Sequence, residues 1–218
     1  STAEWKALYS LSVKQAVAGV CFCGVQRLPK EQLVEMPVRL KLQWFALATQ
    51  IKARNELLNH RCVEVQRMLT EEGMKSCILK GQGVAKLYKI RNEELEVRNG
   101  VNLGHYRQSG DIDVWVDGDR KHVMEYVNSI APTDDVRWLH TQLNVFDDAE
   151  VEIHFMPSYL ECPWHNRALQ RFFDSEKEAC FAIDANTDRF NQVFILAHAF
   201  RHLFSEGVGM RQLMDYYF

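Results

Sequence analysis

The sequence has no surplus of basic residues. Its 26 lysine and arginine residues are outnumbered by 29 aspartate and glutamate residues, so the formal net charge is -3. Proteins that bind long nucleic acids normally carry a basic surplus, because they neutralise many phosphates along the polymer. We therefore do not expect long nucleic acid as a partner.

Long apolar runs and paired cysteine motifs are also missing. The longest strongly apolar stretch near the start, residues 16–25, is too short to span a bilayer, and the first residues lack the basic region of a signal peptide. The closest cysteines, Cys21 and Cys23, have C-x-C spacing rather than the C-x-x-C spacing of zinc ribbons and redox motifs. These features predict reduced thiols, a cytoplasmic protein and no membrane partner.

Helical periodicity dominates the two ends of the chain. Residues 1–73 are predicted to form a helical lead-in of three or four helices, punctuated by Pro29 and Pro37. Residues 161–218 are predicted to form a second helical segment. Its last pattern, residues 211–218, stops without a capping glycine or a polar tail, so we expect this segment to be truncated.

Between residues 74 and 160 the pattern changes to short strands and turns. The expected elements are a strand at 76–79, a turn at 80–83, helical spacing over 84–88, a strand at 111–116, a helix over 120–130 and a hairpin of 139–146 with 150–155. Residues 91–104 are mostly polar and are expected to form an exposed insertion loop. The whole pattern predicts an α+β fold, in which a small mixed sheet with flanking helices lies between the two helical segments.

Asp111 and Asp113 are the first candidates for chemistry. Side chains alternate between the two faces of a strand, so these carboxylates project from the same side, about 7 Å apart. Such a pair suits Mg²⁺, which takes oxygen ligands and usually binds one or two carboxylates together with phosphate oxygens and water. A nucleoside triphosphate would supply those phosphates. The alternative is a pair of solvated or capping acids at a strand end.

Glu152 is the third candidate acid. The strand Val151–Phe155 places Glu152 and His154 on one face, so pairing with the Asp111 strand would bring Glu152 to the same site. Three acids around two Mg²⁺ ions allow one ion to activate an attacking hydroxyl while the other stabilises the leaving pyrophosphate. Otherwise Glu152 is an ordinary exposed strand residue. His154 is interpreted as a hydrogen-bonded core histidine, or as one that supports a metal ligand, rather than as a ligand itself.

The turn Lys80-Gly81-Gln82-Gly83 is a candidate phosphate site. Glycines between a strand and a helix let backbone N–H groups approach a phosphate, and Lys80 would add a positive charge. Arg107 is a further candidate for a triphosphate contact. Lys80 and Arg107 could equally be structural ion-pair residues, and Gly81 could be a turn glycine that needs a positive φ.

Two pairs of residues near the end of the chain have i, i+4 spacing. His198 and His202 could bind zinc at this spacing, but no glutamate base or third ligand accompanies them, which favours simple helix packing. Arg211 and Asp215 are interpreted as a helix ion pair.

The sequence resembles a family of bacterial nucleotidyltransferases within the DNA polymerase beta-like superfamily. The residues that carry the resemblance are Ile78-Leu-Lys-Gly81, Arg107-x-x-Gly110-Asp-Ile-Asp113, Val151-Glu-Ile-His154, Leu196-Ala-His-Ala-Phe-Arg-His202 and Gly209-Met-Arg-Gln-Leu-Met-Asp215. The resemblance extends from about Trp44 to the end of the chain. It implies a polymerase beta-like core at residues 74–160, Mg²⁺, and transfer of a nucleotidyl group from a triphosphate to an acceptor. It also gives Asp215 a contact with the core.

The chain departs from that superfamily in the first turn. Its members usually have Gly-Ser after the first strand, where the serine helps to hold a phosphate, whereas this chain has Lys80-Gly81 followed by Gln82. The leading hypothesis is a nucleotidyltransferase that uses a triphosphate, expected to be ATP, on a small-molecule or protein acceptor. The departure leaves open a catalytically lapsed nucleotide-binding module with a regulatory or interaction role. A third reading is a metal-dependent phosphoesterase that uses the same acids.

Overall fold

The computed structural model describes residues 1–88, 102–183, 185–205 and 207–218. These residues form two compact units. The first contains residues Ser1–Leu57, Ala85–Ser109 and Gly209–Phe218, and the second contains Leu58–Val84 and Gly110–Val208. The predicted division of the chain after residues 73 and 160 stays a prediction. It divides the sequence into consecutive segments, whereas each compact unit combines segments that are distant in sequence.

The first unit is helical. Its elements are α1 (Thr2–Lys14), α2 (Ala18–Val25), η1 (Lys30–Leu33), the first part of α3 (Val38–Glu71), η2 (Leu103–Tyr106) and α9 (Met210–Tyr217). Trp44 of α3 is fully buried in its core, where Nε1 donates to the carbonyl oxygen of Ala18 at 2.8 Å. The three or four helices predicted for the lead-in are thus confirmed for the described residues.

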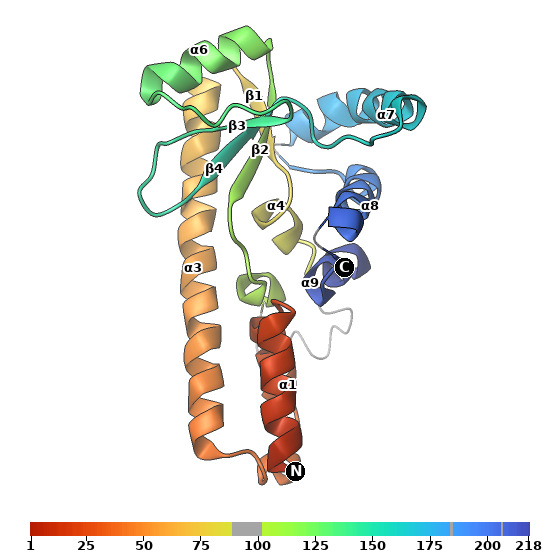
Figure 1. Ribbon diagram of the computed structural model, residues 1–218. Helices are drawn as coiled ribbons and strands as arrows, with labels where there is room; N and C mark the ends of the chain where they lie inside the picture. The colour runs from red at the N-terminus through yellow and green to blue at the C-terminus, as the bar shows by residue number, and fades with distance from the viewer. Residues whose placement is uncertain (89–101, 184, 206) are drawn as a thin grey trace. The chain divides into compact units, whose positions relative to one another are not determined.

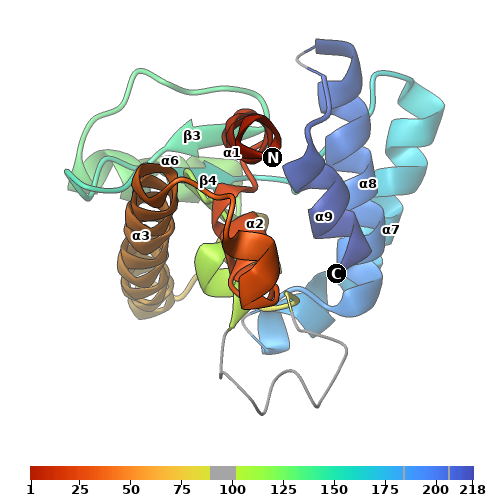
Figure 2. The same cartoon turned by 90° about the horizontal axis from the view of Figure 1, so that it is seen from below.

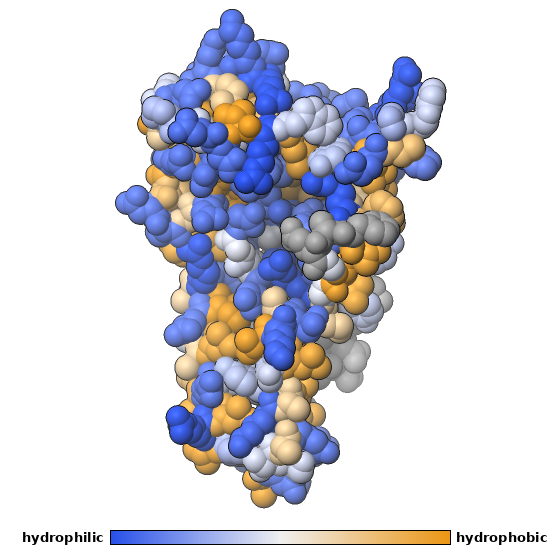
Figure 3. Space-filling model, viewed as in Figure 1, coloured by the Kyte–Doolittle hydropathy of each residue, from blue (hydrophilic) through white to orange (hydrophobic). Residues whose placement is uncertain are grey.

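Part of the surface of this unit is apolar. The space-filling view shows orange residues over α1 and α3 (Figure 3). Leu11 of α1 and Leu42 and Phe45 of α3 each expose more than half of their side-chain surface, at 57%, 62% and 53%. Single exposed apolar residues are common in folded proteins, because polar residues are too few to cover the surface.

The second unit is built on a four-stranded mixed sheet with the strand order β1-β2-β4-β3. Its strands are β1 (Lys75–Ile78), β2 (Ile112–Asp117), β3 (His140–Gln142) and β4 (Val151–His154). β1 pairs antiparallel with β2, β2 pairs parallel with β4, and β3 pairs antiparallel with β4. The predicted α+β fold with a small mixed sheet is therefore confirmed.

The two faces of this sheet have different partners. Ile112, Val114 and Ile153 point to one face and are buried in a core with the end of α3 and with α6 (Arg120–Ile130). Trp115 points to the other face, where its ring lies 4.8 Å from that of Phe181 and 5.6 Å from that of Phe190. The helices that carry these phenylalanines, α7 (Pro163–Ala182) and α8 (Asp188–Ser205), lie side by side (Figures 1 and 2).

Some elements differ from their predicted lengths. The helix expected over residues 84–88 is the single turn α4 (Gln82–Ala85), and β3 covers only the start of the expected strand 139–146. The helix over 120–130 is confirmed. Residues 91–101 of the expected insertion loop lie outside the described residues, and the remainder of that segment leads into η2.

Two other predictions concern the cysteines and membrane-spanning helices. None of the six cysteines forms a disulfide, as expected from their spacing. Among the residues that the structure describes, no helix combines the length and the apolar character that a bilayer span requires.

Candidate metal centre

Adjacent parallel strands bring three carboxylates together. Asp111 directly precedes β2, Asp113 lies within it, and the pairing with β4 places Glu152 opposite Asp113. One carboxylate oxygen from each residue lies within 4.8 Å of the others. The predicted pairing of the Glu152 strand with the Asp111 strand is confirmed, and with it the proximity of the three acids.

Asp113 is the most buried of these acids, with no exposed side-chain surface. Its Oδ1 lies 2.8 Å from Nε2 of His154 and 3.1 Å from Nζ of Lys80. Burial alone raises the pKa of Asp113, but the hydrogen bond from His154 and the charge of Lys80 outweigh it and lower the pKa well below its ordinary value. This carboxylate is therefore ionised at neutral pH.

The second oxygen of Asp113 indicates that the acids fit a metal ion. Oδ2 is buried and has no hydrogen-bond partner among the described residues. A buried carboxylate oxygen without a partner is costly, because it has lost its hydration without compensation. A hard divalent cation bound by Asp111, Asp113 and Glu152 would supply the missing interaction.

Asp111 is half-buried and holds its proton more firmly than an ordinary aspartate. Burial raises its pKa first, and the negative charge of Asp113 raises it further, while Lys80 partly offsets both effects. A bound cation would favour the ionised form of Asp111, so binding of the cation and loss of this proton are coupled.

Lys80 forms an ion pair with the two aspartates. Its Nζ lies 3.1 Å from Oδ1 of Asp113 and 3.7 Å from Oδ2 of Asp111. Burial tends to lower the pKa of Lys80, but the charges of Asp113 and Asp111 outweigh burial and raise it. Lys80 is therefore an ion-pair residue, one of the two alternatives that the sequence allowed. Its ammonium places a positive charge next to the two aspartates.

The turn after Lys80 has the conformation that its glycines suggest. Gly81 has a φ of +61°, which an L-residue rarely adopts, so it meets the requirement of a turn glycine. The side-chain amide of Gln82 donates to Oδ1 of Asn59 at 2.7 Å and so serves to attach the turn to α3. Because α4 is a single turn, the contribution of a helix dipole to phosphate binding is smaller than the sequence suggested.

Two histidines complete the polar face of the sheet. His154 is buried, and its Nε2 forms a hydrogen bond with Oδ1 of Asp113 at 2.8 Å, so the hydrogen bond expected for it is present. His140 lies directly opposite it in the β3–β4 pairing, with the two ring centroids 5.1 Å apart. His140 is not among the candidate residues predicted from the sequence. Its signal was the alternation of the predicted hairpin, which places His140 on the face that carries His154.

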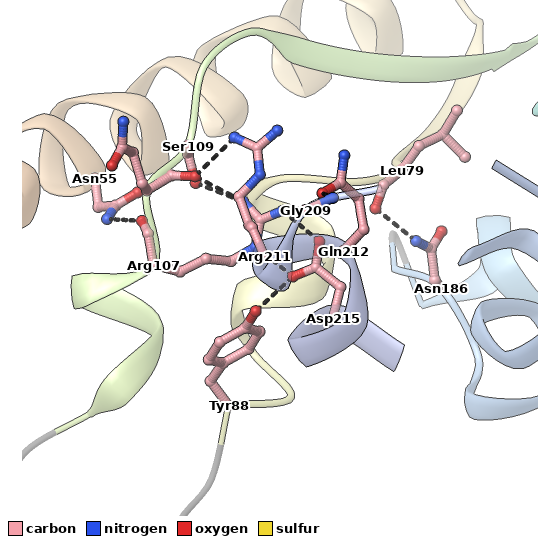
Figure 4. Close-up of polar contacts among 11 residues, drawn as sticks. Asn55, Leu79, Tyr88, Arg107, Ser109, Asn186, Gly209, Arg211, Gln212 and Asp215 are labelled. Atoms are coloured by element: carbon pink, nitrogen blue, oxygen red, sulfur yellow. Dashed lines mark hydrogen bonds and ion pairs between the residues drawn. The ribbon is translucent and has the colours of Figure 1, made fainter. Parts of the chain in front are cut away.

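Arg107 belongs to the first, helical unit, where it is buried. Its Nε and one terminal nitrogen donate to the two carboxylate oxygens of Asp215, both at 2.7 Å, and the hydroxyl of Tyr88 donates to the same carboxylate at 2.6 Å (Figure 4). The helical spacing predicted an ion pair between Asp215 and Arg211, but Asp215 pairs with Arg107. Arg107 is therefore a structural ion-pair residue, one of the alternatives that the sequence allowed. A contact of Arg107 with a triphosphate stays a prediction.

His198 and His202 contact each other on α8, with ring centroids 4.4 Å apart. The ring of His198 also stacks on Phe194 at 6.0 Å. Burial, followed by the positive charge of Lys80, lowers the pKa of His198 to about 3. These contacts agree with helix packing, the interpretation that the sequence favoured.

The fold and the site define a class of protein: an α+β protein whose mixed sheet presents a candidate divalent-cation site. Comparison with known families adds a second indication. Residues 1–93 match the model of a family described as uncharacterised nucleotidyltransferase. The match includes β1 and the turn at Lys80, but it covers less than half of the chain and ends before Asp111. No curated protein and no solved structure matches the chain.

Proposed function

We propose that this protein is a metal-dependent nucleotidyltransferase that moves a nucleotidyl group from a nucleoside triphosphate to a small-molecule or protein acceptor. One observation carries the proposal: three carboxylates from adjacent strands lie within 4.8 Å of one another, and the central one is fully buried with one oxygen unpaired among the described residues. The similarity of residues 1–93 to a nucleotidyltransferase family supports the same reaction class.

The three acids have distinct roles in this proposal. Asp111, Asp113 and Glu152 hold the divalent cations, for which Mg²⁺ is the first candidate because all the donors are carboxylate oxygens. Mg²⁺ bound there would neutralise the phosphates and lower the pKa of the attacking hydroxyl. His154 keeps Asp113 ionised and fixed in orientation through its 2.8 Å hydrogen bond.

Lys80 and Gly81 receive the phosphates in this proposal. Lysine has a flexible stem, so the Lys80 ammonium can turn from the aspartates to a phosphate oxygen once a cation compensates the acids. The positive φ of Gly81 gives the turn a conformation in which backbone N–H groups can face an anion. Phosphate contacts of Gln82 and Arg107 would each require a change of partner, because Gln82 now bonds to Asn59 and Arg107 to Asp215.

A thermal-shift experiment tests the binding step. ATP, GTP, CTP and UTP are each added with and without Mg²⁺, and a triphosphate that binds the native state raises the melting temperature. We expect at least one triphosphate to do so only with Mg²⁺, and Asp111→Asn to abolish the shift. Asp174→Asn, an exposed position on α7, is the matched control and retains it. An unchanged shift in a folded Asp111→Asn variant would remove the proposal.

The position of Lys80 favours a second candidate, a catalytically lapsed nucleotide-binding module. Its Nζ, 3.1 Å from Asp113 and 3.7 Å from Asp111, already supplies positive charge where a cation would bind. A turnover assay with a panel of acceptors separates the candidates. Release of pyrophosphate supports the transferase, and triphosphate binding without turnover supports the lapsed module. Release of orthophosphate from monoesters would instead indicate a phosphoesterase.

A further inference from the structure

A second set of donor atoms lies beside the three carboxylates, on β3 and β4. His140, Glu152 and His154 each offer one ligand atom, and these atoms lie within 4.8 Å of one another. The strand register explains the grouping. His140 is directly opposite His154, and Glu152 lies two residues before His154 on the same face. Two imidazoles and one carboxylate therefore converge without any change of the backbone.

The distances from Glu152 to the two imidazoles suit a tetrahedral ion. Oε2 of Glu152 lies 3.4 Å from Nε2 of His154 and 3.5 Å from Nδ1 of His140. Zinc binds nitrogen and oxygen ligands at about 2.0–2.1 Å in a tetrahedron, which places neighbouring ligand atoms about 3.3–3.4 Å apart. Oδ1 of Asp113, 2.8 Å from Nε2 of His154, is close enough to become a fourth ligand when an ion replaces that hydrogen bond.

The imidazoles also have unused nitrogens. Both ring nitrogens of His140 and Nδ1 of His154 are buried and have no hydrogen-bond partner among the residues described. Of these atoms, Nδ1 of His140 is the one at the site, 3.5 Å from Oε2 of Glu152. Buried polar atoms in folded proteins nearly always have partners, since an unpaired one has lost its hydration without compensation. An unpaired imidazole nitrogen next to a carboxylate indicates that a ligand belongs to this group of residues.

The donor set distinguishes this ion from the Mg²⁺ of the proposed reaction. Imidazole nitrogen suits zinc and related transition metals, whereas Mg²⁺ prefers a shell of oxygen ligands. We propose that His140, Glu152 and His154 form a second cation site for a divalent ion of the zinc class, next to the carboxylate site and sharing Glu152 and, through Oδ1, Asp113 with it. The proposal goes beyond nucleotidyl transfer and does not depend on it, because it rests on the donors alone.

Zinc titration of the untagged protein tests this site. Calorimetry with Zn²⁺ is carried out in millimolar Mg²⁺, so that the carboxylate site is occupied by the competing ion. We expect the wild type to bind one equivalent of Zn²⁺, and His140→Ala to bind it at least about tenfold more weakly. His122→Ala, which removes an exposed histidine on α6, retains the wild-type affinity.

Asp111→Asn separates this inference from the proposed function. It removes an acid of the carboxylate site and leaves both imidazoles, so we expect it to lose triphosphate binding and to keep Zn²⁺ binding. A wild-type protein that binds Zn²⁺ but no triphosphate would therefore count against the transferase and not against the zinc site.

Cobalt provides a readout that does not need a stable His140 variant. Co²⁺ takes the place of zinc, and nitrogen and oxygen donors in a tetrahedron give visible d–d absorption without an intense thiolate charge-transfer band. We expect this spectrum in the wild type. Equal Zn²⁺ affinity in wild type and His140→Ala would overturn the proposal. A thiolate band would do so too, since it would assign the ion to cysteine ligands.

Discussion

Nζ of Lys80 lies 3.1 Å from Oδ1 of Asp113, a carboxylate with no exposed side-chain surface. Removing one partner of a buried ion pair is destabilising, because the remaining charge is left without compensation. We expect Lys80→Met to lower the free energy of unfolding by about 2 kcal/mol in EDTA, a value reduced from the usual 3–5 kcal/mol because Lys80 is partly exposed. Mg²⁺ should recover much of the loss, since a bound cation compensates the same acids.

Urea unfolding at pH 7, with EDTA or with Mg²⁺, measures this effect. Lys121→Met is the matched control, because Lys121 pairs with Glu125 on the surface and has 85% of its side chain exposed. Its unfolding should be almost unchanged in either buffer. If Mg²⁺ does not narrow the gap between Lys80→Met and the wild type, the acids do not hold a cation.

The two glycines after Lys80 should differ in their tolerance of a side chain. A Cβ on Gly81 would meet only the carbonyl oxygen of Asp111 at 3.5 Å, so Gly81→Ala carries the strain of a φ of +61° and should cost about 1–2 kcal/mol. A Cβ on Gly83 would lie 2.3 Å from the carbonyl oxygen of Ile78. Backbone would have to move, so Gly83→Ala should cost more.

Gly110→Ala is the control in the same unit. A Cβ at Gly110 meets nothing within 4 Å, so its stability should stay close to that of the wild type. Thermal unfolding of the three alanine variants gives the order. A Gly83→Ala variant as stable as Gly110→Ala would show that the close approach to Ile78 is not a feature of the protein in solution.

The pair between Arg107 and Asp215 makes a prediction for the helical unit. Asp215→Ala leaves the buried guanidinium of Arg107 and the hydroxyl of Tyr88 without their shared acceptor, so it should cost about 3–5 kcal/mol. Replacing both partners, as in Arg107→Met with Asp215→Leu, should recover part of the loss, because no buried charge then remains.

Denaturant unfolding of the single and double variants measures the coupling. Glu56→Gln serves as the control, since Glu56 forms an exposed pair with Lys52 on α3. Its effect should be small, as for most surface ion pairs. A double variant that is no more stable than Asp215→Ala would show that the cost lies in packing and not in the uncompensated charge.

Local periodicity was sufficient to predict most of the candidate site. Alternation along single strands placed Asp111 with Asp113 and Glu152 with His154, and this alternation depends only on neighbouring residues. The same rule applied to the first strand of the hairpin would have identified His140. The helix over residues 120–130 was equally predictable, because its apolar residues recur at helical spacing.

Contacts distant in sequence could not be predicted in this way. Arg107 and Asp215 are 108 residues apart, and no local pattern links them. The ion pair of Lys80 depends on where the turn meets β2, which is set by pairing between β1 and β2. The length of α4 was also misjudged, since residues 84–88 have helical spacing but the helix ends at Ala85.

The half-buried His198 predicts how stability depends on pH. Burial and the charge of Lys80 lower its pKa from 6.5 to about 3 in the folded protein. Between these two values the unfolded chain binds a proton at this position that the folded protein does not, so stability must fall as the pH decreases from about 6.5 towards 3. Allowing for partial exposure to solvent, we expect this residue to account for a loss of about 1–2 kcal/mol between pH 7 and pH 5.

His198→Gln removes this titrating group and should weaken the pH dependence by that amount. Leu196→Gln, an exposed position on the same helix, is the control and should retain the wild-type slope. Urea unfolding in EDTA at pH 5, 6 and 7 provides the comparison, because EDTA keeps metal binding from contributing its own pH dependence. Parallel curves for wild type and His198→Gln would show that the pKa of His198 is the same in the folded and unfolded states, and that burial and the charge of Lys80 do not lower it.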